Sequence, residues 1–271
     1  YIDTSGEPLF KRGWRVDKGD APLKETLAAA MIAATGWDPL GEQPLPLYDP
    51  CCGSGTVLIE AAQMACRIAP GSQRRFAFEK LLPYQQHVWI AIKNEAVSVV
   101  TTSVTPIFGS DVSHRMVDFA QRNAERAGVA ASVQLRGGDA LQRLPPCEQP
   151  GVMLLNPPYG ERIAAAGSAG RNARERMGQV QRAGRETAQT DDGVDFFAQL
   201  AAHWKRHYAG WQAWMLTPDL KLPGKMRLKE SRRVPMWNGP IECRLLRFDL
   251  VAGSARARAQ PPADAGAPDA S

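Results

Sequence analysis

Cysteines are few in this sequence and long hydrophobic runs are missing, and each shortage argues against a class of protein. The five cysteines among 271 residues are odd in number and show no paired spacing. This argues against a disulfide-built secreted domain and favours a reducing compartment. No apolar run approaches the roughly 20 residues of a membrane-spanning helix, and the N-terminus, YIDTSGEPLFKRGWR, lacks the pattern of a signal peptide. We therefore expect a cytoplasmic protein without a membrane partner.

The length and charge of the chain suggest one domain and a polyanionic partner. At 271 residues and 44% hydrophobic content, the chain can bury one substantial core with extensions, whereas two large domains would be cramped. A formal net charge of +5 and a pI near 9.0 suit a partner such as nucleic acid. Because the sequence begins at Tyr1 in mid-pattern, we expect it to be a piece of a longer protein.

The stretch LYDPCCGSGTVLIE, residues 47–60, reads as a strand, a tight loop and a helix. Asp49 stands where the strand ends, and Gly53 and Gly55 can adopt positive φ and let a ligand touch bare backbone. The loop has neither the lysine of a triphosphate-binding loop nor the third glycine of the dinucleotide fingerprint. The pattern indicates another kind of nucleotide-binding α/β domain, although Gly-x-Gly alone is equally compatible with a simple turn.

Acidic residues also stand at the ends of the second and third strands that the sequence predicts. Residues 99–108 are β-branched and rich in threonine, which is typical of a strand, and Asp111 follows them. Residues 132–136 predict the third strand, which leads to Asp139. Each acid alone is typical of a turn or a helix cap. Together with Asp49 they should converge at the carboxyl edge of the sheet, where Asp111 could accept hydrogen bonds from a ribose.

An apolar strand over residues 152–155, expected to be central, delivers Asn156-Pro157-Pro158-Tyr159. The prolines lack N–H donors and stiffen the loop. An exocyclic amine could donate one hydrogen to the Asn156 side-chain oxygen and another to the Pro157 carbonyl, which would align its lone pair with an electrophilic methyl group. Tyr159 could stack on the target ring. The alternative is a proline-rich turn with a core tyrosine.

The remaining periodicity predicts a doubly wound α/β domain. Apolar residues at helical spacing recur between the strands, and Asn238-Gly239 predicts an antiparallel hairpin at the end of the sheet. Helices are expected over residues 21–35, capped by Asp20, and over 56–69, 84–97, 116–127 and 196–208, and later strands over residues 211–217, 233–237 and 243–250.

Several basic or histidine-containing segments leave more than one interpretation open. Residues 1–20 interleave basic and aromatic side chains, which is typical of nucleic-acid contact or of a solvated edge hairpin. His203 and His207 lie four apart on an expected helix, but without a third ligand nearby we expect no metal site. A candidate face for the RNA backbone comprises Lys205, Arg206, Lys221, Lys225, Arg227, Lys229, Arg232 and Arg233.

Four motifs resemble one family of enzymes: SGEPLFKRGWR at 5–15, APLKETLAA at 21–29, NPPYGER at 156–162 and NGPIEC at 238–243. With DPCCGSGT, they resemble class I S-adenosylmethionine-dependent methyltransferases, and more narrowly the bacterial large-subunit ribosomal RNA guanine-N2 methyltransferases. The resemblance implies a Rossmann-like sheet of seven strands with a terminal antiparallel hairpin. It implies cofactor contacts from Asp49, Gly53, Gly55, Asp111 at the ribose, and Asp139 with Ala140 at the adenine, and guanine contacts from Asn156, Pro157 and Tyr159.

The resemblance covers residues 1–250 and suggests how the chain is divided. Residues 1–36 would lead into a methyltransferase domain at 37–250, with an arginine-rich flexible insertion at 164–192 and a disordered tail at 251–271. The insertion could clamp RNA phosphates or be solvated filler. Such enzymes usually carry a THUMP module before this segment and often a second methyltransferase domain after it. Rival functions are methylation of adenine N6 or of a glutamine amide, or a catalytically silent RNA-binding module.

Overall fold

The computed structural model describes residues 2–19, 22–157 and 192–252, with side chains in the last range from residue 196 onward. In this part of the chain, seven strands form one sheet in the order β3-β2-β1-β4-β5-β7-β6. The first five strands are parallel, and β7 pairs antiparallel with both β5 and β6. The predicted fold, with its terminal antiparallel hairpin, is thereby confirmed. The strands are β1 (Leu47–Asp49), β2 (Ile107–Asp111), β3 (Gln134–Gly137), β4 (Val152–Leu155), β5 (Gln212–Thr217), β6 (Arg232–Asn238) and β7 (Ile241–Asp249).

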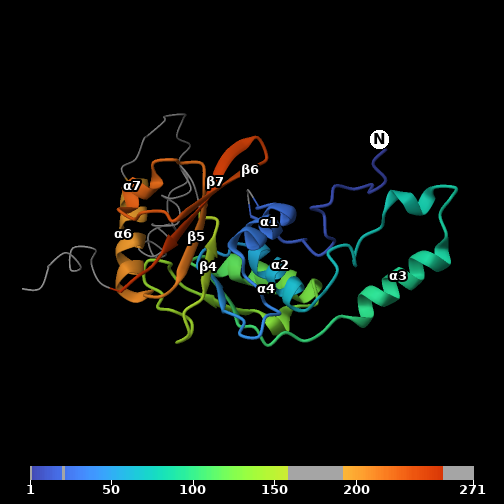
Figure 1. The fold of residues 1–271 in the computed structure, drawn as a ribbon, viewed down its shortest axis with the longest axis horizontal. Helices are drawn as coiled ribbons and strands as arrows, with labels where there is room; N and C mark the ends of the chain where they lie inside the picture. The colour runs from blue at the N-terminus through green and yellow to red at the C-terminus, as the bar shows by residue number, and fades with distance from the viewer. Residues whose placement is uncertain (1, 20–21, 158–191, 253–271) are drawn as a thin grey trace, which may run out of the picture.

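The central strand β4 shows how the sheet separates two hydrophobic cores. Val152 and Leu154 pack into the core on one face, whereas Met153 and Leu155 pack into the core on the other. This alternation follows from the two-residue period of a strand, and it explains why β4 is apolar throughout. The first face is covered by α1 (Glu25–Thr35), α2 (Thr56–Ala65) and α4 (His114–Arg126), and the second by α6 (Asp192–His207) and α7 (Leu222–Met226) (Figure 1).

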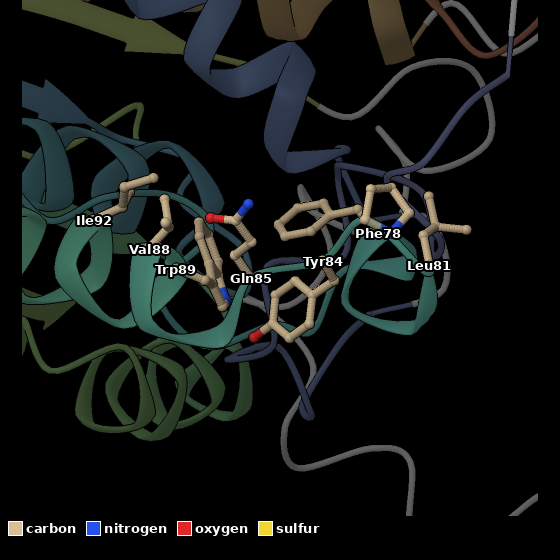
Figure 2. A pocket seen from close by; sticks show the side chains of 8 residues that line it. Phe78, Leu81, Tyr84, Gln85, Val88, Trp89 and Ile92 are labelled. Carbon is tan, nitrogen blue, oxygen red and sulfur yellow. The ribbon is translucent and has the colours of Figure 1, made fainter.

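An arm, defined here as residues 70–100, extends away from the sheet between α2 and β2 (Figure 1). It contains the short helix η1 (Ala77–Lys80) and α3 (Gln86–Ser98), and no residue of either helix is buried. Aromatic side chains hold the arm together, with the rings of Phe78 and Trp89 edge to face at 5.0 Å. They line an apolar groove of about 390 Å³ (Figure 2). The groove lies on the arm and not at the ends of the strands.

The second strand was expected over residues 99–108, but most of that range is not part of the sheet. Strand β2 begins only at Ile107, which pairs with Leu47 of β1, and residues 99–104 are largely exposed. A β-branched run without a neighbouring strand has no pleated surface to pack on, so its propensity is not expressed. At the other end the strand is longer than expected and includes Gly109, where a Cβ would lie 2.1 Å from Leu58 Cδ1 of α2. The close approach of α2 therefore requires glycine there.

The N-terminal segment is an irregular strap and not the edge hairpin considered from the sequence. No strand forms in the described residues 2–19. We define the N-terminal strap as residues 9–18; its Trp14 is 1% exposed, and it crosses α2 and α4. The side chains of Arg12 and Arg15 form ion pairs with Glu60 and Glu25 and are only 11% exposed. Two of the basic side chains offered as nucleic-acid contacts thus point into the domain.

Candidate functional site

Three of the predicted site residues lie on one edge of the sheet, which we call the carboxyl edge. Asp49 and Asp111 are the last residues of β1 and β2, and Asp139 follows the last residue of β3 by two positions. Asp49 pairs in register with Gly109, and Asp111 pairs with Gly137. Each acid therefore lies two residues further along its strand than the acid beside it. All three acids therefore lie on the same edge of the sheet, and their roles in cofactor binding stay a prediction.

Burial and mutual repulsion give this acidic cluster unusual electrostatics. Desolvation, and secondarily the nearby charge of Asp111, raise the pKa of Asp49 to about 8, against the effect of a hydrogen bond from the Cys51 N–H. Desolvation also raises the pKa of Asp111. No ion pair involves either acid within the described residues. A buried carboxylate without a cation is costly, so the site is suited to a ligand that carries positive charge.

Cys51 lies among all three acids and its thiol stays protonated. Desolvation raises its pKa well above the ordinary value, and the charges of Asp49, Asp111 and Asp139 raise it further. Burial likewise raises the pKa of the Cys52 thiol well above its ordinary value, and the charges of Asp49 and Asp111 raise it further. Because only a thiolate is an effective nucleophile, neither cysteine is equipped for covalent catalysis. Small apolar filler is the better description of both.

The glycine loop, residues 50–55, is fixed by the strand ends below it. The Gly53 N–H donates to Asp111 Oδ2 at 2.9 Å, and the Cys52 N–H donates to the Ser110 carbonyl at 2.9 Å. Gly53 has a φ of 53°, and a Cβ built on it would meet nothing within 4 Å. Gly55 has a φ of 86°, and its Cβ would lie 2.9 Å from the Cβ of Ala120. Gly53 thus leaves open space for a ligand, whereas Gly55 is required by the packing of α4.

The turn after β3 presents the third acid beside a small buried residue. Asp139 Oδ1 accepts a hydrogen bond of 2.9 Å from the Leu141 N–H, which leaves the carboxylate with further acceptor capacity. Ala140, the predicted adenine contact, is 7% exposed. The Gly138 N–H donates to the Asp111 carbonyl at 2.9 Å and ties this turn to the end of β2. The turns after β2 and β3 therefore form one connected wall.

Asn156 and Pro157 stand on the other side of Asp49 along the same edge. Tyr48 pairs with Met153, so Asp49 is level with Leu154, two residues before Asn156. Asn156 is half-buried and Pro157 is buried. The structure therefore brings Asn156 to the edge that carries the three acids. Tyr159 lies outside the described residues, as do nearly all of the 164–192 insertion and the 253–271 part of the tail.

Asn123 of α4 is a residue of this region that the sequence reasoning missed. It is fully buried, and its Nδ2 donates to the Ser54 carbonyl of the glycine loop at 3.0 Å. A signal was present, because Ala120, Ala124 and Ala127 place Asn123 on the inward face of an amphipathic helix. A polar residue in that phase needs buried hydrogen-bond partners.

The basic residues near the C-terminus are spread over β6, α6 and the segment around α7. Arg232 begins β6 opposite Arg247, which pairs with Trp214 of β5, and Trp214 pairs with Leu154 of β4. Arg232 is therefore level with Leu154, two residues before Asn156, but lies on the strand at the far side of the sheet. Lys205, near the end of α6, donates from Nζ to the Arg227 carbonyl at 2.9 Å. The role of these side chains as a face for the RNA backbone stays a prediction.

The two histidines of α6 contact a backbone carbonyl and each other's ring. His203 Nε2 lies 2.7 Å from the Arg143 carbonyl oxygen, and the ring of His207 is 4.8 Å from that of His203. No group of three possible metal ligands occurs within the described ranges.

The same ranges contain no helix that is both long enough and apolar enough to cross a membrane. All five cysteines are described and are free thiols.

The raised pKa of Asp49 predicts how the stability of the unliganded protein changes with pH. Folding raises this pKa from 3.8 to about 8, so the stability that Asp49 contributes is present below about pH 4 and is lost as the pH rises through about 8. Asp49→Asn removes the ionisation and keeps an acceptor for the Cys51 N–H. We expect the variant to gain stability over the wild type from about pH 5 to about pH 9, measured by urea denaturation. If the stabilities of the two proteins changed with pH in parallel, the raised pKa of Asp49 would be wrong.

Comparisons with known proteins identify relatives of the chain. The family model UPF0020, described as an RMKL-like methyltransferase domain, matches residues 12–183. A Shewanella loihica protein named ribosomal RNA large subunit methyltransferase K/L is 38% identical over 260 residues, which cover 94% of this chain and 33% of that protein. The chain therefore spans about a third of the length of this curated relative.

Solved structures with similar folds include two at close to 30% identity. SMU.472, a putative methyltransferase complexed with SAH, has a TM-score of 0.74 and 30% identity, with 94% of this chain and 58% of that chain covered. A predicted N6-adenine-specific DNA methylase from Listeria monocytogenes has a TM-score of 0.72 and 29% identity, with 91% and 56% covered. The name of the latter concerns adenine, whereas that of the Shewanella protein concerns ribosomal RNA.

Proposed function

Because this chain belongs to the UPF0020 family of RMKL-like methyltransferase domains, we propose that it methylates the exocyclic N2 of a guanine in large-subunit ribosomal RNA. The methyl donor is S-adenosyl-L-methionine. The observation that carries the proposal is the common position of Asp49, Asp111, Asp139 and Asn156 on the carboxyl edge. Three acids suited to a cationic nucleoside ligand lie there beside an asparagine suited to an amine.

The groups on the carboxyl edge fit the chemical parts of this methyl donor. Its ammonium and sulfonium charges match the buried, unpaired carboxylate of Asp49. Its ribose hydroxyls match Asp111, whose two oxygens already orient the Gly53 and Ser113 N–H groups and retain free lone pairs. The open space above Gly53 allows the ligand to approach the backbone. Asp139 and the buried Ala140 fit the adenine end.

In the proposed reaction, the protein acts mainly by positioning the target amine toward the methyl donor. When bound, the cofactor would supply an electrophilic methyl group, whose carbon would bond to the guanine nitrogen while its bond to sulfur breaks. In the proposal, the Asn156 side-chain oxygen and the Pro157 carbonyl each accept one N–H of the guanine amine. These two hydrogen bonds fix the direction of the nitrogen lone pair, and the proton released after transfer passes to solvent. No strong base is required, and the protonated thiols nearby take no part.

The choice of ribosomal RNA as substrate is supported by the relatives and by the charge of the chain. The Shewanella loihica relative is named for the large ribosomal subunit, and the net charge of +5 suits an RNA partner. We place the reaction in the cytoplasm, which the five free thiols support. A THUMP module and a second methyltransferase domain would accompany this domain in a longer parent protein.

The proposal is tested by identifying the nucleoside that receives the methyl group. Wild-type protein is incubated with S-adenosylmethionine carrying a deuterated methyl and with unmodified large-subunit ribosomal RNA, and the RNA is digested and analysed by mass spectrometry. We expect label in N2-methylguanosine. Label in N6-methyladenosine would refute the choice of base, and cofactor binding without labelled RNA would favour a silent module or a different substrate.

A further inference from the structure

Arg15 of the N-terminal strap reaches the first residue of the helix that follows the glycine loop. Its Nη2 donates to Thr56 Oγ1 at 2.7 Å and to the Leu23 carbonyl at 2.8 Å. Its Nε lies 2.9 Å from Glu25 Oε1, and the two side chains are 11% and 4% exposed. Since Thr56 directly follows Gly55, this guanidinium fixes the point where the loop becomes helix.

Asn123 makes a second bridge between the strap and the glycine loop. Its Nδ2 donates to the Ser54 carbonyl at 3.0 Å and to the Asp17 carbonyl at 2.8 Å. Its Oδ1 accepts from the backbone N–H groups of Val16 and Asp17, both at 3.3 Å. One buried amide thus holds the strap and the loop at the same time, and it is fully satisfied only when both are in place.

These bridges are buried, so their loss cannot be compensated by solvent. Desolvation raises the pKa of Glu25, and the charge of Arg15 opposes that rise. Undocking of the strap would therefore remove the cation beside Glu25, the donor to Thr56 Oγ1 and one acceptor for Asn123 Nδ2, whereas Asn123 Oδ1 would keep its contact with Arg126. The loop atoms concerned, the Ser54 carbonyl and Thr56 Oγ1, are part of or adjacent to the segment that the proposed function assigns to the cofactor.

We propose that Arg15 and Asn123 are positioning residues that couple the N-terminal strap to the glycine loop, and that their own hydrogen bonds to Thr56 and Ser54 hold the loop in the conformation that binds the cofactor tightly. The inference rests on the proposed function, because it assumes that the loop holds S-adenosylmethionine. Coupling between two sites is reciprocal. Cofactor binding should therefore hold the strap more firmly against α2 and α4.

The same strap offers a matched control in the ion pair between Arg12 and Glu60. Arg12 Nη2 lies 3.1 Å from Glu60 Oε2, and these side chains are 11% and 3% exposed, which is nearly the burial of the Arg15 pair. Glu60, however, is one turn further along α2 than Thr56 and makes no hydrogen bond to residues 50–55 among the described contacts. Arg12→Ala should cost stability without disturbing the loop.

The experiment measures S-adenosylhomocysteine affinity by calorimetry, well below the melting temperature of each variant. Arg15→Ala and Asn123→Ala should weaken binding about 5- to 100-fold, whereas Arg12→Ala should lower the melting temperature with less than about a twofold change in affinity. Thr56→Val, which deletes only the acceptor for Arg15 and nearly preserves volume, should weaken binding less than Arg15→Ala. It keeps the test decisive if the larger truncations fail to fold.

Hydrogen exchange distinguishes coupling from a merely structural role, because only coupling makes exchange in the strap depend on ligand binding at the loop. In the wild type, S-adenosylhomocysteine should slow exchange of the amides of residues 14–17, and in Thr56→Val this slowing should be reduced. Wild-type affinity in all folded Arg15, Asn123 and Thr56 variants would overturn the coupling, as would an equal loss in Arg12→Ala. Absence of binding by the wild type itself would instead overturn the proposed function, and this inference with it.

Discussion

Asp49→Ala is expected to abolish measurable binding of S-adenosylmethionine, although the variant should fold. Removing one partner of a buried charge pair costs about 2–5 kcal/mol, or roughly 30-fold to several thousand-fold in affinity. Asp49 is buried and has no ion pair among the described residues, so the cofactor would be its only cation. Calorimetric titration with S-adenosylmethionine, alongside thermal unfolding, measures both effects.

Cys147→Ser is a suitable control for this prediction. Cys147 is half-buried, lies in the connection that leads to β4, and donates from Sγ to the Gln149 carbonyl. A serine can make the same hydrogen bond, so the control should keep wild-type affinity. Unchanged affinity in folded Asp49→Ala would mean that the acidic cluster does not hold the cofactor, and the assignment of the carboxyl edge would be wrong.

Asn156→Ala is expected to remove turnover while sparing the affinity for S-adenosylmethionine. The side-chain oxygen is proposed to hold one N–H of the target amine, and misplacing a reacting atom costs on the order of a hundredfold or more in rate. Single-turnover methylation of unmodified ribosomal RNA, with cofactor affinity measured in parallel, separates the two effects.

Asn156→Asp distinguishes hydrogen-bond acceptance from mere shape. An aspartate keeps an acceptor oxygen at the same distance from the backbone, so it should recover part of the rate that the alanine variant loses. The account would be contradicted by an alanine variant that turns over like the wild type. It would also be contradicted if both variants lost cofactor affinity in proportion to rate, because Asn156 would then act on the cofactor.

The sequence predicted the sheet well where local pattern and burial agree. Strand β4 was delimited correctly because residues 152–155 are apolar and bounded by Gly151 and Asn156. The final hairpin was located correctly because Asn238-Gly239 is a strong turn signal, although its strands differ from the expected bounds by one or two residues. The acids at the strand ends followed from the same pattern. Their convergence was predictable because the carboxyl ends of parallel strands share one edge.

Features that depend on long-range contacts could not be read from the sequence. The β-branched residues 99–104 resemble a strand but have no neighbouring strand, and the apolar periodicity of α3 does not reveal that the helix stands away from the core. The strap looks basic and exposed, yet Arg12 and Arg15 find buried carboxylates on distant helices. The position of Asn123 on the inward face of an amphipathic helix indicated a buried polar residue, but only the fold shows that its partners are the Ser54 and Asp17 carbonyls.

The most direct test of the central claim is a structure of this chain determined with S-adenosylhomocysteine bound. The account predicts that the ribose hydroxyls lie within hydrogen-bonding distance of the Asp111 carboxylate, the adenine beside Ala140, and the sulfur on the side of the site that faces Asn156. A ligand bound elsewhere, for example in the groove of the arm, would contradict it. So would a ligand on the carboxyl edge whose sulfur faces away from Asn156.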